Sequence, residues 1–336
     1  MLSPVPVITK STNWQEALSQ SVNNGAHLLQ LLGLDAQQVG LSEQAAKDFP
    51  IKTTHSYVAR MAPGDPNDPL LRQVLASGLE EQQVPGYTAD PVGEVAHSNV
   101  QSGMLQKYDG RVLLLVTSAC AVHCRYCFRR HFPYSDNRNS RADWALAVDA
   151  IAQDASIREV IFSGGDPLVA SDGQLKALVD AVARLPHVRR LRFHSRLPIV
   201  LPERVNDPLI DAITHPDART AMVVHANHPQ EINTEVSRAL RHLVERDVSV
   251  LNQSVLLAGI NDSVETLAAL SETLYDAGTL PYYLHLLDKV SGAAHFDVPL
   301  ESARRLHQAL HARLPGYLVP RLVKEEAGAS GKTLLA

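Results

Sequence analysis

From Arg111 onward, short apolar runs alternate with longer amphipathic runs, and this alternation restricts the fold more than any other feature of the chain. The apolar runs are rich in leucine or β-branched residues and predict strands at 111–117, 158–163, 189–195, 219–225, 247–256 and 281–287. The amphipathic runs predict helices at 141–153, 171–185, 232–246, 262–277 and 300–313. Strands that are separated by helices pair in parallel. Six such units are fewer than the eight that close a barrel, so we expect an α/β fold, a partial (β/α)6 TIM-like barrel with its site at the carboxyl ends of the strands.

The region before this pattern, residues 1–105, is predicted to be an N-terminal helical extension that packs on the main domain. Apolar side chains at roughly helical spacing predict one helix over 13–34 and a second over 43–48. A cluster of Pro, Gly and Asp at 63–69 predicts a surface turn before the next helix. The main domain is expected to span 106–315, followed by a C-terminal segment over 316–336.

The net charge of −5 and the sequence pI of about 6.3 give no reason to expect a nucleic-acid surface. No stretch approaches the roughly 18 apolar residues of a membrane span, and the first residues lack the charged and apolar segments of a signal peptide. We therefore expect a cytoplasmic protein that binds neither nucleic acid nor a membrane.

All three cysteines of the 336-residue chain, Cys120, Cys124 and Cys127, lie on one loop directly after the first predicted strand. Clustered thiols fit a reducing compartment better than a disulfide framework. Three thiolates can hold a four-iron cluster and leave one iron open to a small chelating molecule. Two other interpretations remain open, a structural zinc site completed by His123 or His131 and a redox pair of Cys124 and Cys127. The spacing Cys-x3-Cys-x2-Cys favours the cluster, because zinc sites usually combine two separated cysteine pairs.

Polar motifs also follow the other predicted strands. The second strand is followed by a glycine pair that lets the backbone approach a ligand, in the segment Ser163, Gly164, Gly165 and Asp166. Polar residues end the third, fourth and fifth strands as well, at His194, His225 and Gln253. Because the carboxyl ends of parallel strands lie on one side of a sheet, these segments predict a pocket.

The cysteine spacing resembles that of the radical S-adenosylmethionine (SAM) enzymes, and further segments narrow the resemblance to the lysine 2,3-aminomutase family. These segments are Cys-Arg-Tyr-Cys-Phe-Arg-Arg, Phe-Ser-Gly-Gly-Asp-Pro-Leu, Arg-Leu-Pro-Ile-Val-Leu-Pro-Glu-Arg-Val, His-Ala-Asn-His-Pro-Gln-Glu-Ile and Asn-Gln-Ser-Val-Leu-Leu-Ala-Gly-Ile-Asn-Asp. The similarity runs from about residue 58 to residue 333 and is greatest to the short members, which make (R)-β-lysine for the modification of elongation factor P. The resemblance implies an isomerase that converts (S)-α-lysine to (R)-β-lysine with a [4Fe–4S] cluster, SAM and pyridoxal 5'-phosphate (PLP).

The resemblance also implies roles for individual residues. The three cysteines would hold the cluster, and further cofactor contacts are expected at Ser163, Gly164, Gly165, Asp166, His225 and Gln253, the first four along the methionyl amino group of SAM. Lys332 matches the lysine that forms a Schiff base with PLP. Arg111 and Lys107 match the basic positions that bind the PLP phosphate, although the family has arginine at the second position.

For the substrate, Arg129 matches the arginine that binds the α-carboxylate of lysine. Asp288 and Glu325 match two acids that hold the ε-ammonium group. Longer members have aspartate at the second position, so the extra methylene of Glu325 shortens the space for substrate. Longer members also have zinc-binding cysteines and a C-terminal extension that are absent here, so zinc is not expected and their oligomeric interface is not implied.

The expected partners are free L-lysine, a one-electron reductant such as flavodoxin or ferredoxin, and a ligase that transfers β-lysine to elongation factor P. Two alternatives stay open. The substrate could be another amino acid, ornithine, arginine or glutamate, of which glutamate is disfavoured by the charges of Asp288 and Glu325. The chain could also be a zinc-stabilised module without enzymatic activity.

Overall fold

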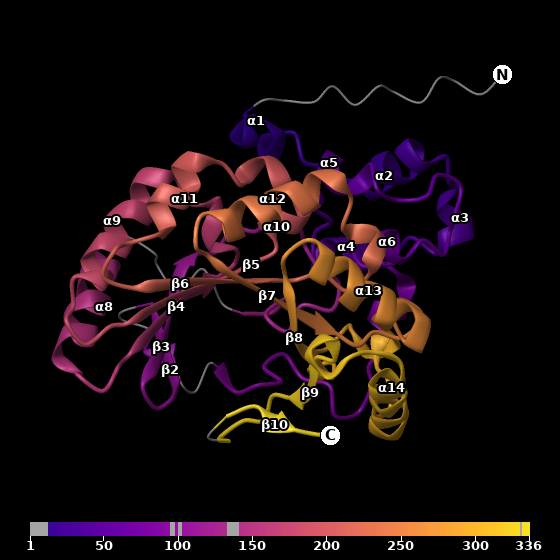
Figure 1. The fold of residues 1–336 in the computed structure, drawn as a ribbon. Helices are drawn as coiled ribbons and strands as arrows, with labels where there is room; N and C mark the ends of the chain where they lie inside the picture. Colours follow the sequence, from indigo (N-terminus) through magenta and orange to yellow (C-terminus); the bar gives the residue numbers. More distant parts are fainter. Residues whose placement is uncertain (1–12, 95–97, 100–102, 133–140, 330) are drawn as a thin grey trace.

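Ten strands form one sheet in the order of the chain in the computed structural model, which describes residues 13–94, 98–99, 103–132, 141–329 and 331–336 (Figure 1). They are β1 (Ser98–Asn99), β2 (Met104–Tyr108), β3 (Arg111–Thr117), β4 (Glu159–Gly164), β5 (Arg190–Ser195), β6 (Arg219–Val224), β7 (Ser249–Val255), β8 (Leu280–His285), β9 (Arg321–Lys324) and β10 (Thr333–Leu334). The pairs from β3 to β9 are parallel. The pairs β1–β2, β2–β3 and β9–β10 are antiparallel.

Each of the six predicted strands is present, as β3 to β8, and each is followed by a helix. These helices are α8 (Arg141–Gln153), α9 (Asp172–Ala183), α11 (Asp207–Ile213), α12 (Thr234–Glu245), α13 (Val264–Asp276) and α14 (Leu300–Arg313). Six β/α units in an open, mostly parallel sheet confirm the predicted fold class. The helix α11 and the additional parallel strand β9 were not predicted, nor were the shorter elements α10 (Leu197–Val200) and β10.

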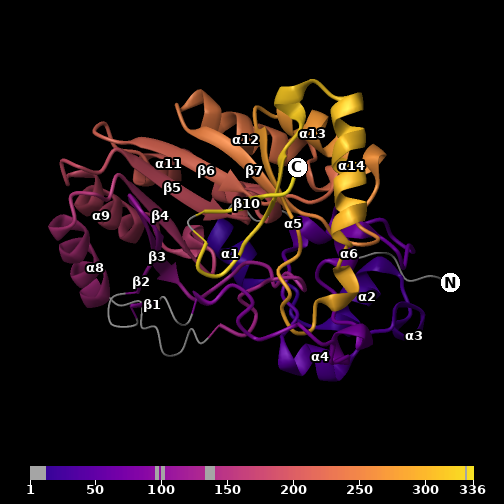
Figure 2. The same cartoon turned by 90° about the horizontal axis from the view of Figure 1, so that it is seen from below.

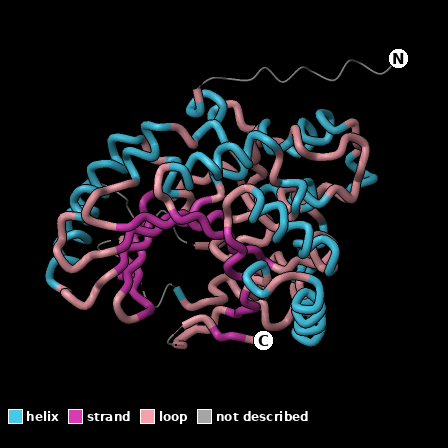
Figure 3. The backbone as a smooth tube through the Cα atoms, in the orientation of Figure 1, coloured by secondary structure: helices cyan, strands magenta, loops and turns pink. Residues whose placement is uncertain are grey.

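The helices lie outside the curved sheet, and the strands form an arch inside them (Figure 3). The layer between sheet and helices is closely packed. Phe162 of β4 and Phe193 of β5 stack with ring centroids 4.4 Å apart, in the same core as Leu178 of α9 and Leu209 of α11. Short helical turns complete the connections, namely α10 (Leu197–Val200), η2 (Pro167–Val169), η3 (Pro202–Arg204), η4 (Pro229–Glu231), η5 (Ala294–Phe296) and η6 (Gly316–Leu318).

The N-terminal region is built of short helices, α1 (Trp14–Ser19), α2 (Gly25–Leu32), α3 (Ala36–Val39), α4 (Glu43–Asp48), α5 (His55–Val58), α6 (Pro69–Arg72) and η1 (Gly78–Glu81). Of these, α2 to α4 and α6 lie at the end of the molecule opposite α8 and α9 (Figures 1 and 2). The predicted helix 43–48 is confirmed as α4, and the predicted turn precedes α6. The strand β2 spans residue 105, the expected boundary of this region, and pairs with β3.

The single helix predicted over 13–34 is wrong, because the chain leaves the helix after α1 and starts a new one at α2. Val22 exchanges two backbone hydrogen bonds with Thr53, at 2.8 and 2.9 Å, and a residue paired in this way cannot be helical. Asn24 then caps α2 by accepting a hydrogen bond from the His27 amide.

Among the helices of the described segments, none combines the length and the apolar composition that crossing a membrane requires.

Candidate active site

The structure brings every residue that the sequence assigned to the site to one cavity of about 420 Å³. These residues are Lys107, Arg111, Cys120, Cys124, Cys127, Arg129, Ser163, Gly164, Gly165, Asp166, His225, Gln253, Asp288, Glu325 and Lys332. The cavity reaches from Arg111, at the beginning of β3, to the cysteines beyond its end, and the seven residues of β3 span roughly 20 Å. The site therefore follows the inside of the arch. We had expected it at the carboxyl ends of the strands, but it is not confined to them.

The three cysteines are free thiols that line the cavity at the end of β3. Their loop is closed by a hydrogen bond of 3.0 Å from the Cys127 amide to the Cys124 carbonyl. Burial and the neighbouring thiol of Cys127 raise the pKa of Cys120, and burial and Cys124 raise the pKa of Cys127 to about 12. Such thiols are protonated at neutral pH unless a metal centre binds the thiolate. Three soft sulfur donors on one loop fit a [4Fe–4S] cluster.

The two histidines that could have completed a zinc site face backbone groups. His123 Nδ1 is 2.7 Å from the Pro50 carbonyl oxygen, and its ring stacks on Phe49. His131 Nε2 is 3.2 Å from the carbonyl oxygen of Ser291. In the described part of the chain, no three His, Cys, Asp or Glu side chains surround a point as ligands of one metal ion do.

Glu80 of η1 fixes the cysteine loop from outside. Its two carboxylate oxygens accept hydrogen bonds from Arg125 Nε at 2.8 Å and Nη2 at 2.6 Å, and from Arg130 Nη2 at 2.7 Å. The Ser77 amide donates a further one, at 3.0 Å. The side chain of Arg125 is fully buried and that of Glu80 is 2% exposed, so this charge pair is shielded from water. It ties the loop that carries Cys127 to the N-terminal region.

The glycine pair at the end of β4 packs directly against the end of β3 and the cysteine loop. Gly164 has φ +115°, and a Cβ atom there would lie 2.5 Å from the Thr117 carbonyl oxygen; at Gly165 it would lie 2.4 Å from that of Ala119. Both oxygens of Asp166 are occupied: Oδ1 accepts from Ser195 Oγ at 2.7 Å, and Oδ2 accepts from the amide that follows Ser195, at 2.8 Å. Asp166 thus joins the ends of β4 and β5 beside the cysteines.

The opposite end of the cavity is basic. Arg111 lies with its guanidinium 4.5 Å from the Tyr108 ring centroid, and its buried Nε has no hydrogen-bond partner among the described residues. Lys107 Nζ donates to the Val92 carbonyl at 3.0 Å and is 4.0 Å from Glu325. A buried N–H group without a partner at a cavity wall suits an anion, so these two residues fit the PLP phosphate.

Lys332 stands next to β10, which pairs with β9 so that Thr333 faces Lys324. The continued register places Lys332 opposite Glu325, and their Nζ and Oε2 atoms are 2.6 Å apart. The other oxygen of Glu325 accepts a hydrogen bond from the Tyr108 hydroxyl. A lysine amine that faces the cavity from the residue just before a paired strand fits the expected attachment point of PLP.

Asp288 follows β8 and is the second acid of this end of the cavity. Burial raises the pKa of Asp288 to about 7; the Lys332 ammonium opposes this shift, and Glu325 adds to it. Near neutral pH the carboxyl group therefore ionises readily when a cation approaches.

Arg129 is held by an acid that the sequence did not reveal. Arg129 Nε and Nη2 donate to the two oxygens of Glu94 at 2.7 and 2.8 Å, while Nη1 donates to Ser163 Oγ at 3.1 Å and to the Gly164 carbonyl at 3.2 Å. A substrate carboxylate at Arg129 must therefore share this guanidinium with Glu94.

Three histidines contribute further polar atoms to the cavity, His194, His225 and His285. In each of them Nε2 is buried and has no hydrogen-bond partner within the described residues. Burial lowers the pKa of all three, that of His225 to about 3, so they are neutral at physiological pH. The polar residues at the strand ends indicated His194 and His225. His285 was missed because it lies within a run that was assigned to a strand from its apolar residues.

Three free thiols in the spacing Cys-x3-Cys-x2-Cys, a glycine pair packed on their loop and one cavity inside a partial parallel barrel define a radical SAM enzyme. The sequence profile of the Radical SAM superfamily matches residues 114–270. Among solved structures, a radical SAM methyltransferase from Sphaerobacter thermophilus aligns with a TM-score of 0.45 and 19% identity, over 66% of this chain and 68% of that one.

Curated relatives place the chain more narrowly. The L-lysine 2,3-aminomutase of Haemophilus influenzae is 42% identical over 100% of this chain and 99% of its own length, and that of Escherichia coli is 45% identical over 96% and 94%. The enzyme of the same name from Clostridium subterminale is 33% identical over 96% of this chain and 77% of its own length. This chain belongs to the L-lysine 2,3-aminomutase family. Membership confirms the resemblance seen in the motifs, the expectation of an isomerase and, with the Radical SAM profile, the expected [4Fe–4S] cluster and SAM.

Proposed function

We propose that this chain is an L-lysine 2,3-aminomutase that converts (S)-α-lysine to (R)-β-lysine. The observation that carries the proposal is the ion pair of 2.6 Å between Lys332 and Glu325, at the end of the cavity that Asp288 also lines. A cavity carboxylate that already binds an alkylammonium group suits the ε-ammonium group of free lysine. A second acid beside it favours a cationic substrate over glutamate.

When bound, the cluster and SAM would supply a 5'-deoxyadenosyl radical, and PLP would supply the carrier for the amino group that is transferred from C2 to C3. In the proposal, Cys120, Cys124 and Cys127 hold the cluster and Lys332 holds PLP. Once Lys332 is bound to PLP its ammonium charge no longer occupies Glu325, which is then available to the substrate. Arg129 orients the α-carboxylate. Turnover requires a one-electron reductant of the flavodoxin or ferredoxin kind.

The test is an anaerobic assay of the reconstituted enzyme with L-lysine, L-ornithine, L-arginine and L-glutamate in parallel, with the products identified by mass spectrometry. We expect a β-amino acid from lysine. A β-amino acid from ornithine or arginine, with none from lysine, would transfer the proposal to that substrate. Absence of product from all four, in protein with full iron and PLP content, would refute it.

Lys332→Ala tests the assignment of the PLP lysine. The variant should retain iron but form no β-lysine, and borohydride should no longer trap PLP on the protein. Lys324→Ala is the matched control, because Lys324 lies on the adjacent strand, is exposed and pairs with Glu326. Normal turnover by Lys332→Ala would end the assignment.

We further propose that the product serves the modification of elongation factor P. The support is the resemblance to the short family members, together with coverage of 99% and 94% of the relatives from H. influenzae and E. coli, against 77% of the longer clostridial relative. Deletion of the gene should remove a β-lysyl adduct from elongation factor P, as read from its intact mass. The wild-type gene should restore the adduct and Lys332→Ala should not; an unchanged mass after deletion would assign the product another use.

A further inference from the structure

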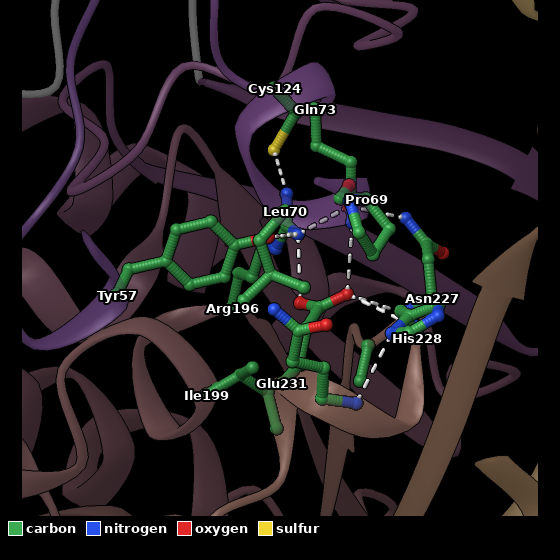
Figure 4. A network of polar contacts seen from close by, with 12 residues as sticks. Tyr57, Pro69, Leu70, Gln73, Cys124, Arg196, Ile199, Asn227, His228 and Glu231 are labelled. Carbon is green, nitrogen blue, oxygen red and sulfur yellow. Dashed lines mark hydrogen bonds and ion pairs between the residues drawn. The ribbon is translucent and has the colours of Figure 1, made fainter. Parts of the chain in front are cut away.

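A buried arginine contacts one of the cluster cysteines (Figure 4). Arg196 follows β5, and its Nη1 is 2.7 Å from Cys124 Sγ. Its Nη2 donates to Gln73 Oε1 at 2.7 Å, to Glu231 Oε2 at 2.9 Å and to the Tyr57 hydroxyl at 3.1 Å. The guanidinium group therefore lies between a cysteine sulfur on one side and a carboxylate on the other.

Glu231 is held as firmly as the arginine. Its Oε1 accepts from the amides of Asn227 at 2.8 Å and His228 at 3.1 Å, and from Gln73 Nε2 at 3.2 Å. Its side chain is fully buried, and that of Arg196 is 6% exposed. Burial alone would raise the pKa of Glu231, but the Arg196 charge and these hydrogen bonds lower it below its usual value, so the group is a carboxylate.

Reduction of an iron–sulfur cluster adds negative charge to it. Hydrogen bonds to the cysteine sulfurs and the net charge nearby decide how readily that charge is accepted. In a buried site these effects are stronger than at the surface, because water does not screen them. A positive N–H donor on Cys124 favours the reduced state, and a negative charge just behind that donor weakens its effect.

We propose that Arg196 is a positioning residue that stabilises the reduced cluster through its hydrogen bond to Cys124, and that Glu231 sets the strength of this stabilisation. The proposal requires the cluster of a radical SAM enzyme but not lysine as the substrate. The proposal differs from a purely structural role of this network. In a purely structural role, the Arg196 and Glu231 charges would not have opposite effects on the reduction of the cluster.

The test is an anaerobic redox titration of the reconstituted holoenzyme, with the reduced cluster quantified by electron paramagnetic resonance and iron determined for each preparation. At the wild-type midpoint, Arg196→Met should lower the ratio of reduced to oxidised cluster at least tenfold, which corresponds to about 59 mV for one electron. Glu231→Gln should raise the same ratio, because it removes the opposing charge and keeps the shape of the side chain.

Arg60→Met is the matched control. Arg60 is buried in the same layer, but it donates to the backbone carbonyls of Glu231 and Ile199 in place of a sulfur. Because the Arg60 charge acts on Glu231 and Arg196 but makes no contact with a sulfur, its variant should shift the midpoint less than Arg196→Met does, and a shift equal to that of Arg196→Met would overturn the proposal. Shifts of the Arg196 and Glu231 variants in the same direction would also overturn it. If Arg196→Met fails to hold iron, Glu231→Gln alone provides the test. A ratio of reduced to oxidised cluster that does not rise in Glu231→Gln would then refute the proposal.

Discussion

Glu80 gives the cysteine loop a buried support, and Glu80→Gln tests how much that support contributes. The wild-type carboxylate receives three N–H groups from Arg125 and Arg130 at 2.6 to 2.8 Å, and all three side chains are at most 2% exposed. Glutamine keeps the shape but offers one acceptor oxygen and no charge. Two buried guanidinium groups then lose their shared counter-ion.

Removing one partner of a buried ion pair lowers the free energy of unfolding by about 3–5 kcal/mol, and here two arginines lose their partner. With an m-value of roughly 3 kcal/mol/M, the urea midpoint should fall by about 1–1.7 M at unchanged slope. Because both arginines flank Cys127, the variant should also lose iron faster than the wild type when it is incubated with a chelator. Far-UV circular dichroism measures the urea midpoint, and iron analysis measures the loss of iron.

Asp207→Asn is the control for Glu80→Gln. Asp207 also has two basic partners, Arg246 at 2.5 Å and His242 at 3.1 Å, but its side chain is 66% exposed. Its substitution should cost less than about 1 kcal/mol and leave iron retention unchanged. Equal midpoints for Glu80→Gln and the wild type, or equal losses for the two variants, would refute the argument that burial makes the Glu80 contact strong.

Three further changes probe the cavity. The kcat/KM ratio of wild type to Asp288→Asn for lysine should rise with pH through and above neutrality, because burial raises the pKa of Asp288 to about 7 even beside a charged Lys332, and only the ionised form binds the substrate ammonium. Loss of the Lys332 charge in the PLP-bound enzyme raises this pKa further, and a flat ratio would contradict the argument. Gly164→Ala places a Cβ atom 2.5 Å from the Thr117 carbonyl oxygen at φ +115°, so it should lower the free energy of unfolding by more than about 2 kcal/mol and lower the iron content. Gly173→Ala, whose Cβ atom meets no atom within 4 Å, should do neither. Glu94→Gln should tighten binding of a carboxylate probe such as 6-aminohexanoate about five- to tenfold in calorimetry, because Arg129 then keeps its full charge for the ligand; weaker binding would show that Glu94 instead positions Arg129.

The elements that were predicted correctly carry their signal in their own residues. The strands β3 to β8 are short runs rich in leucine or β-branched residues, and the predicted helices between them are amphipathic. β9 has only four residues, with exposed charged side chains at Arg321 and Lys324, so it has too few residues for a period to be visible. The helix over 13–34 failed for another reason: Val22 pairs with Thr53, which local spacing does not reveal.

The residues of the candidate site divide in the same way. The cysteine spacing, the glycine pair and Lys332 are local motifs, and the structure places all of them at the cavity. The acids that hold the arginines were missed, because Glu80 lies 45 residues from Arg125 and Glu94 lies 35 residues from Arg129. The sequence did contain one indication of these acids. The cysteine loop carries several arginines, and arginines that become buried need acidic partners elsewhere in the chain.

The cavity along the inside of the arch also has a consequence for how the fold is completed. In closed α/β barrels this volume is filled with side chains from the strands. Here about 420 Å³ of it is accessible to small molecules, so bound cofactors take the place of interior packing. Ligands that bind only the folded chain stabilise it in proportion to their occupancy. Loading with cofactors should therefore raise the melting temperature and slow amide exchange in β3 and β8, two of the strands that line the cavity.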